Sequence, residues 1–281
     1  MKIIVILFFS MLLALPTYGQ NRETDYLSHV LEKMNAVESV TYHCVKKAWE
    51  PGDKEPVYSV PREIYEHVNP QDTAVGYSFL CASDKEFRQP LWVYDGTVFA
   101  YIEKEEKEVR IDDFTQKSPL PFRVIMPQTF GCMKSILEYV LNTQDSIVLS
   151  LKDEGKDYLM ELSIHTPYQV EFFGKACYMP QNPYIYDPTS IYKIWISKEN
   201  DMPYRYRREM QHSISEDICS DFVYNPSGKG KIVAEDYYPA DYVRRIKGEK
   251  SQKATVDMTG KKAPEERLTD REGQKVSLGH R

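Results

Sequence analysis

The stretch LWVYDGTVFAYIE at residues 91–103 places Asp95-Gly96 between two runs of aromatic and aliphatic residues. An Asp-Gly pair in this setting is the strongest short-range indication of a β-hairpin, because both residues tolerate the positive φ angles that a tight turn requires. The stretch therefore predicts two antiparallel strands, 91–94 and 97–101, joined by a two-residue turn.

Segments of the same kind lie on both sides of this hairpin. Two further hairpins are predicted, with turns at Glu154-Gly155 and at Asn200-Asp201. Other strands are expected in segments rich in β-branched and aromatic residues: 39–49, 63–68, 76–82, 107–114, 219–226 and 231–238. Residues 238–246 form either a short helical turn or an edge strand.

Two amphipathic helices interrupt the strands. Residues 24–37 carry an apolar stripe at i, i+3, i+4 and i+7, the spacing of one helix face, formed by Leu27, Val30, Leu31 and Met34. A second apolar face lies within residues 133–142 and comprises Ile136, Leu137, Tyr139, Val140 and Leu141.

Many consecutive strands, few helices and no strand–helix alternation predict a mainly antiparallel sheet in the α+β class. Because strand twist accumulates, a sheet of this size is expected to bend strongly. A bent sheet has a concave face that must be covered, and the two helices are the candidates. We therefore predict an open half-barrel whose concave face is covered by amphipathic helices.

The first residues have the character of a signal peptide. Lys2 precedes an apolar run from 3 to 15, Pro16 ends it, and small residues follow. We expect residues 1–19 to be removed and the mature chain to begin at Gln20, in the periplasm or another exported location. The apolar run is shorter than the roughly 20 residues of a membrane span, so no stable membrane anchor is expected.

Composition excludes some function classes. The net charge is −6 and the pI about 5.6, which argues against a general nucleic-acid-binding protein. The sequence has no phosphate-binding loop, nucleophile elbow or zinc-protease pattern, and its six histidines show no metal spacing. We predict no catalytic residues, no metal and no cofactor. The 21 tyrosines suit either a wet cavity or an ordinary β-rich core.

Five cysteines are scattered singly along the chain: Cys44, Cys81, Cys132, Cys177 and Cys219. Their odd number leaves at least one unpaired within the chain. They can be buried free thiols, include one structural disulfide, or include a reactive thiol. His43 beside Cys44 does not favour a nucleophilic pair, because neighbours in a strand point to opposite faces.

The signal peptide, the first helix, Tyr94-Asp95-Gly96 and the segment IWISKENDMPYRYRRE at 194–209 together resemble the LolA-like periplasmic lipoprotein-carrier fold. The resemblance covers about residues 22–250, so we take 20–250 as one LolA-like domain. It implies a hydrophobic concave face that accepts a hydrophobic small molecule, an acyl chain, a lipoprotein or another client protein. The residues then expected to contact that ligand are Leu27, Val30, Leu31, Met34, Ile136, Tyr139 and Val140. The alternative is a closed core that binds nothing.

The last residues have a different character. Residues 251–281 begin as a charged, polar linker, and GKKAPEERLTDREGQKVSL at 260–278 resembles the start of TlpA-like and thiol-specific antioxidant redoxins. The residues that match are Gly260, Ala263, Pro264, Leu268, Asp270, Gly273, Val276, Ser277 and Leu278, whereas Glu266 and Arg267 depart from the pattern. The Trp-Cys-x-x-Cys site that follows in that family is absent, so we expect a truncated start of a thioredoxin-like domain.

Two hypotheses follow for function. The chain is either a non-catalytic binding or accessory module, or the N-terminal fragment of a two-domain thiol-disulfide oxidoreductase. A Trp-Cys-x-x-Cys sequence encoded downstream of Arg281 would favour the second hypothesis.

Overall fold

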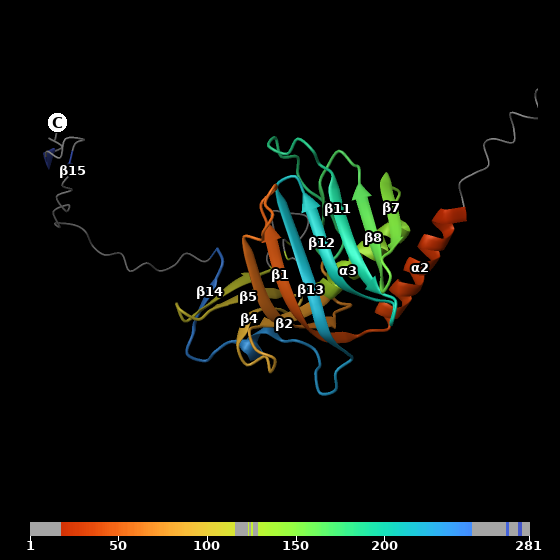
Figure 1. The fold of residues 1–281 in the computed structure, drawn as a ribbon. Coiled ribbons are helices and arrows are strands. Elements are labelled where there is room, and N and C mark those ends of the chain that lie inside the picture. The colour runs from red at the N-terminus through yellow and green to blue at the C-terminus, as the bar shows by residue number, and fades with distance from the viewer. Residues whose placement is uncertain are drawn as a thin grey trace, which may run out of the picture. The chain divides into compact units, whose positions relative to one another are not determined.

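The computed structural model describes residues 18–115, 123, 125, 129–248, 268–269 and 275–276 (Figure 1). The chain divides into two compact units, Met1–Lys247 and Gly248–Arg281. The predicted signal peptide lies almost wholly outside the described residues. In the second unit β15 (Leu268–Thr269) pairs antiparallel with β16 (Lys275–Val276). The redoxin resemblance itself stays a prediction.

The described residues of the first unit include two α-helices, α2 (Tyr18–Asn35) and α3 (Thr129–Asn142), and one 3-10 turn, η1 (Ala234–Tyr237). Its strands in chain order are β1 (Ser39–Trp49), β2 (Tyr58–Val68), β3 (Tyr77–Ala82), β4 (Pro90–Tyr94), β5 (Val98–Glu103), β6 (Glu108–Asp113), β7 (Ile147–Asp153), β8 (Asp157–Ile164), β9 (Val170–Phe172), β10 (Ala176–Tyr178), β11 (Ser190–Ser197), β12 (Met202–Met210), β13 (Ser213–Tyr224) and β14 (Val243–Ile246).

Twelve of these strands form one sheet in the order β14-β6-β5-β4-β3-β2-β1-β13-β12-β11-β8-β7. Neighbouring strands are antiparallel throughout, except that β14 runs parallel to β6. The strands change direction along the sheet, and its two edge strands, β14 and β7, do not pair (Figure 1). The sheet is therefore bent and open, which confirms the predicted α+β class and half-barrel.

The predicted hairpins are present. Asp95-Gly96 joins β4 to β5, with Gly96 at φ +98°, and the turns near residues 155 and 201 join β7 to β8 and β11 to β12. For residues 238–246 the sequence allowed either a short helical turn or an edge strand. The structure has an edge strand there, β14, which follows η1.

Both helices pack on one face of the half of the sheet that runs from β1 through β13 to β7 (Figure 1). We call this side of the sheet the inner face and the opposite side the outer face. α2 begins at Tyr18 and α3 at Thr129, each several residues before the predicted start. The predicted covering of the concave face is confirmed for this half of the sheet.

Strand register shows which other side chains share the inner face. Ile64 lies opposite Cys81, and Cys81 lies opposite Trp92. Trp92 in turn lies opposite Tyr101. Directly opposite residues point to the same side of a sheet. Because Ile64 and Cys81 belong to the core under the helices, the whole row lies on the inner face.

The outer face of β2–β6 is also apolar. Its central row is buried and comprises Tyr65, Leu80, Val93 and Ala100. Ile232 and Ala234, from the segment around η1, pack against this row. The sheet therefore has apolar residues on both faces in this half, with the η1 segment covering the outer one.

A buried carboxylate joins α3 to the sheet. Glu66 of β2 is 0% exposed and accepts hydrogen bonds from the Tyr42 hydroxyl (2.5 Å) and the backbone N–H groups of Phe130 and Gly131 (both 3.0 Å). These N–H groups belong to the first turn of α3, where helix donors have no partner within the helix. A Cβ at position 131 would lie 2.9 Å from Glu66 Oε2, so only glycine allows this approach.

Burial raises the pKa of Glu66 to about 7, although the hydrogen bonds from Tyr42, Gly131 and Phe130 oppose the rise. The folded pKa lies above the ordinary value of 4.5, so the folded state binds more protons than the unfolded state between these two values. The contribution of Glu66 to stability is therefore complete below pH 4.5 and is lost as the pH rises through 7.

We predict that Glu66→Gln removes this pH dependence. A glutamine has one acceptor oxygen for two N–H donors, so the variant should lose on the order of 1–3 kcal/mol of unfolding free energy at pH 5. The difference in unfolding free energy between wild type and variant should shrink by on the order of 2 kcal/mol between pH 5 and pH 8. Over this range the wild type loses the contribution of Glu66 to its stability. Urea unfolding at both pH values measures the two free energies. The exposed Glu86→Gln is the control, and a pH-independent deficit in Glu66→Gln would contradict the prediction.

Candidate functional site

The residues predicted to contact a hydrophobic ligand lie in one core cluster. Leu27, Val30, Met34 and Ile136 are each 0% exposed and Val140 is 7% exposed. Leu31 and Tyr139 are partly buried against the same cluster. The helices thus close their half of the inner face, and contact between these residues and a ligand stays a prediction that requires helix movement.

An acidic side chain in the β11–β12 turn fastens α2. Asp201 accepts a hydrogen bond from the Tyr26 hydroxyl (3.0 Å) and from Lys33 Nζ (3.1 Å), and His29 Nε2 lies 3.4 Å from its carboxylate. Burial opposes ionisation of Asp201, but the hydrogen bonds from Lys33 and Tyr26 outweigh it and lower its pKa. Three residues on one helix face therefore converge on one carboxylate.

A groove of about 680 Å³ lies beside this turn. Its lining combines apolar and charged residues: Lys156, Asp157, Ser197, Lys198, Glu199, Asn200, Met202, Pro203, Tyr204, Phe222 and Tyr224. Phe222 and Tyr224 stack on one another, with ring centres 5.7 Å apart, and pack against the core under the helices. The groove is a possible entrance to the closed half.

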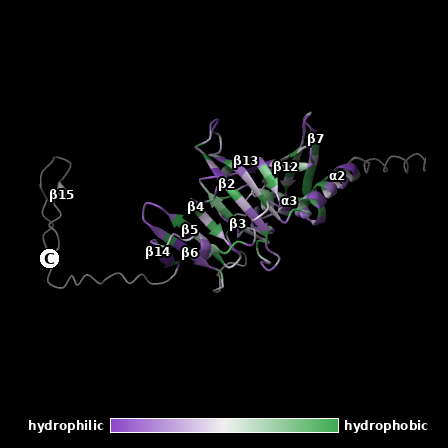
Figure 2. Cartoon of the chain, turned by 90° about the horizontal axis from the view of Figure 1, so that it is seen from below, coloured by the Kyte–Doolittle hydropathy of each residue, from purple (hydrophilic) through white to green (hydrophobic). Residues whose placement is uncertain are grey.

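Apolar residues of the inner face stay exposed where the two helices do not pack. We call the set Tyr58, Val60, Trp92, Phe99 and Tyr101 the aromatic face. Tyr58 is 41%, Val60 37% and Tyr101 45% exposed, and the other two are half-buried. Figure 2 shows hydrophobic residues along the strands at both ends of the sheet, not only beside the helices.

The rings of the aromatic face form a continuous series. The ring centre of Trp92 lies 5.6 Å from that of Tyr101, and the Tyr101 ring lies edge-on to Phe99 at 5.3 Å. Phe99 in turn contacts the buried Phe79 at 6.2 Å. The interpretation of the sequence missed this surface, although the hairpin at 91–103 indicates it. In that hairpin, apolar side chains occur at both odd and even positions. Because alternate residues of a strand point to opposite faces, each face of the sheet receives apolar side chains.

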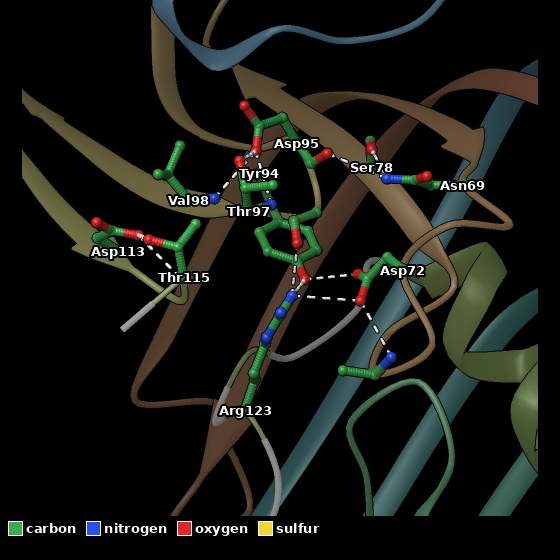
Figure 3. Close-up of polar contacts among 12 residues, drawn as sticks. Asn69, Asp72, Ser78, Tyr94, Asp95, Thr97, Val98, Asp113, Thr115 and Arg123 are labelled. Carbon is green, nitrogen blue, oxygen red and sulfur yellow. Dashed lines mark hydrogen bonds and ion pairs between the residues drawn. The ribbon is translucent and has the colours of Figure 1, made fainter. Parts of the chain in front are cut away.

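A polar cluster borders the aromatic face (Figure 3). The Tyr94 hydroxyl donates to Asp72 at 2.6 Å, and Arg123 Nη1 donates to the same hydroxyl (2.6 Å), to the Gly96 carbonyl (2.6 Å) and to Asp72 (3.2 Å). Asn69 donates to the Asp95 carbonyl in the hairpin turn. Each group already has a partner within the cluster, so the arrangement fastens the 69–76 turn to the β4–β5 hairpin and leaves no group for chemistry.

The five thiols are free and buried. Burial raises the pKa of Cys132 to about 12, and it also raises those of Cys81 and Cys177. A raised pKa disfavours the thiolate, which is the nucleophilic form. These surroundings oppose the reactive-thiol alternative at these three positions. Within the part of the chain that the structure describes, no three metal-ligating side chains come together.

No family model matches the sequence, and no curated protein matches it. Similar solved structures include a DUF1329 family protein from Desulfovibrio piger, with 12% identity, a TM-score of 0.36, and coverage of 80% of this chain and 98% of that one. Lipoprotein LppX from Mycobacterium tuberculosis matches with 9% identity, a TM-score of 0.37, and coverage of 73% and 96%. A LolA superfamily protein from Nitrosomonas europaea matches with 10% identity, a TM-score of 0.28, and coverage of 77% and 99%.

These solved structures have low sequence identity to this chain and low TM-scores. Their ligands and partners therefore say nothing about the ligand or partner of this chain. Membership of the LolA-like family stays a prediction. Among the described helices, none has the length and apolar character needed to cross a membrane.

We predict that Asp201→Asn loosens α2 locally. Asparagine tolerates the positive φ of this turn position (+53°) but removes the charge that pairs with Lys33. The partly exposed pair contributes on the order of 1 kcal/mol at most, so amide exchange in α2 should accelerate by up to about fivefold. Hydrogen–deuterium exchange with mass spectrometry measures this, with the β1–β13 pair expected to stay unchanged.

Asp241→Asn is the matched control for this prediction. Asp241 precedes β14 and pairs with Lys107, so the same chemical change is made away from the α2 contact. Equal exchange of α2 in wild type and Asp201→Asn would show that the Asp201 contacts do not hold the helix.

Proposed function

We propose that this chain is an exported, non-catalytic binding domain that accepts a hydrophobic ligand on the inner face of its bent sheet. The observation that carries the proposal is the aromatic face, which stays exposed beside a half that two helices close completely. Contiguous exposed apolar surface is uncommon in monomeric proteins and marks binding sites for ligands, membranes or partner proteins. An acyl chain, another hydrophobic small molecule, or the lipidated or apolar segment of a client protein fits this description.

The shape of the surface favours a ligand over a second folded sheet. The aromatic face lies on the concave side of the bend, where a narrow apolar molecule gains contacts on more than one side. Each methylene removed from water contributes about 0.8 kcal/mol, so a chain of moderate length suffices for micromolar binding.

The helix residues form a second part of the same proposal. Five of these residues become available only when α2 or α3 moves away from the sheet: Leu27, Val30, Met34, Ile136 and Val140. Leu31 and Tyr139 are already partly exposed. The groove beside Asp201 is where such an opening would start. In this proposal the exposed aromatic face binds first, and the helix residues extend the site.

We predict that the full chain binds the neutral hydrophobic probe N-phenyl-1-naphthylamine saturably, with micromolar affinity. Tyr101→Ser should weaken binding about tenfold, because it removes an aromatic ring from the exposed surface. Fluorescence titration measures the dissociation constants. Tyr186→Ser is the matched control, since Tyr186 is 85% exposed in the β10–β11 loop, away from the aromatic face.

Leu31→Lys tests the helix residues separately. Leu31 is partly exposed, so a lysine there can keep its charge in water while the fold persists. Loss of affinity confined to Leu31→Lys would assign the ligand to the helices and overturn the role of the aromatic face. Absence of saturable binding to the wild type would overturn the proposed function.

A further inference from the structure

Arg62 is a half-buried cation at the border of the aromatic face. It lies on β2 directly opposite Cys44, and its guanidinium carbon is 4.3 Å from the centre of the Trp92 ring. Its Nε is buried and has no hydrogen-bond partner, and no ion pair of the described residues includes it. The adjacent Glu63 accepts from His43 and occupies the alternate position of the strand, on the outer face.

The nearest acidic residues on the inner face already have partners. Asp217 lies 3.6 Å from Lys46 Nζ and accepts a hydrogen bond from the Thr129 hydroxyl at 2.9 Å. Glu66 is fully buried at the first turn of α3. Neither carboxylate pairs with Arg62. Because a buried or half-buried charge is costly unless it is paired, Arg62 is open to an anion from outside the chain.

Lys46 adds a second positive charge beside Arg62. Lys46 lies two residues after Cys44 in β1, so the two cations are diagonal neighbours on the inner face. Asp217 raises the pKa of Lys46, whereas burial and the charge of Arg62 oppose the rise. Asp217 therefore pairs with Lys46 and not with Arg62, and the positive charge of Arg62 remains at the border of an apolar surface.

We propose that Arg62 is the headgroup site for a carboxylate, and that the ligand of this domain is an anionic single-chain amphiphile of the fatty-acid type. This inference rests on the proposed function. A guanidinium binds a carboxylate through two parallel hydrogen bonds, and Trp92 holds the plane of this guanidinium by stacking. From Arg62 the rings of Trp92, Tyr101 and Phe99 continue in contact, so the apolar chain lies along them.

The test compares dodecanoate with dodecan-1-ol, which have the same number of carbons but differ in headgroup charge. Each competes with N-phenyl-1-naphthylamine for the full chain at pH 8, where the fatty acid is ionised. We expect dodecanoate to bind at least tenfold more tightly than the alcohol. Arg62→Gln should reduce the affinity for dodecanoate to that of the alcohol and leave the alcohol unchanged.

Arg244→Gln is the matched control, because it removes the same charge from a residue that lies opposite Val109 on the outer face and pairs with Glu235. It should leave both affinities unchanged. Arg62→Lys keeps the positive charge but lacks the planar guanidinium group, so it should retain part of the preference for dodecanoate over the alcohol. Thermal unfolding of each variant shows whether its fold persists.

The outcomes separate this inference from the proposed function. Equal affinity for the acid and the alcohol in the wild type, with the neutral probe still bound, would overturn the headgroup site and leave the hydrophobic site intact. A parallel loss of both affinities in Arg62→Gln would also overturn it, because Arg62 would then only shape the surface. Failure of the neutral probe to bind would overturn the proposed function and this inference with it.

Discussion

The hydrogen bonds that Glu66 accepts from the first turn of α3 fix where that helix begins on the sheet. Glu66 lies on β2, close to the junction between the closed half and the aromatic face. Its side chain accepts hydrogen bonds from the N–H groups of Phe130 and Gly131, which have no partner within the helix. Because the carboxylate is fixed on a strand, the start of the helix is fixed too. From this point α3 extends over β12 and the β9–β10 pair.

This constraint leaves the β2–β5 part of the sheet with more apolar surface than the described helices cover. The outer face there is buried by the segment around η1, and Tyr65, Leu80 and Val93 form a second core. The inner face of the same strands carries another apolar set, led by Trp92 and Tyr101. A strand that is apolar on both sides needs cover on both sides. On the inner face, Val75 and Ile125 cover Phe79 and Tyr94, whereas Tyr58, Val60 and Tyr101 stay exposed.

Much of the fold could be predicted from the sequence because it depends on local patterns. Asp95-Gly96 specifies its turn by backbone preference, and the spacing of Leu27, Val30 and Met34 specifies a helix face. The start of α3 could not be predicted, because its cap comes from Glu66, more than sixty residues away in sequence. The unpaired state of Arg62 could not be predicted either, since it depends on which partners Asp217 and Glu66 find in three dimensions. Local reasoning therefore proposed the helix residues as a site, which stays a prediction, and did not indicate the sheet residues.

The two parts of the inner face differ in what a ligand must overcome. Lifting α2 exposes Leu27, Val30 and Met34, and each buried side chain contributes roughly 1.5–3 kcal/mol. At about 0.8 kcal/mol per methylene, an acyl chain must bury on the order of six to eleven methylenes before it compensates for that opening. The aromatic face requires no opening, because β2–β5 hold Trp92 and Tyr101 in place without the helices. In the proposed function a ligand would therefore bind the exposed surface first, and only a long chain would gain enough free energy to continue under α2.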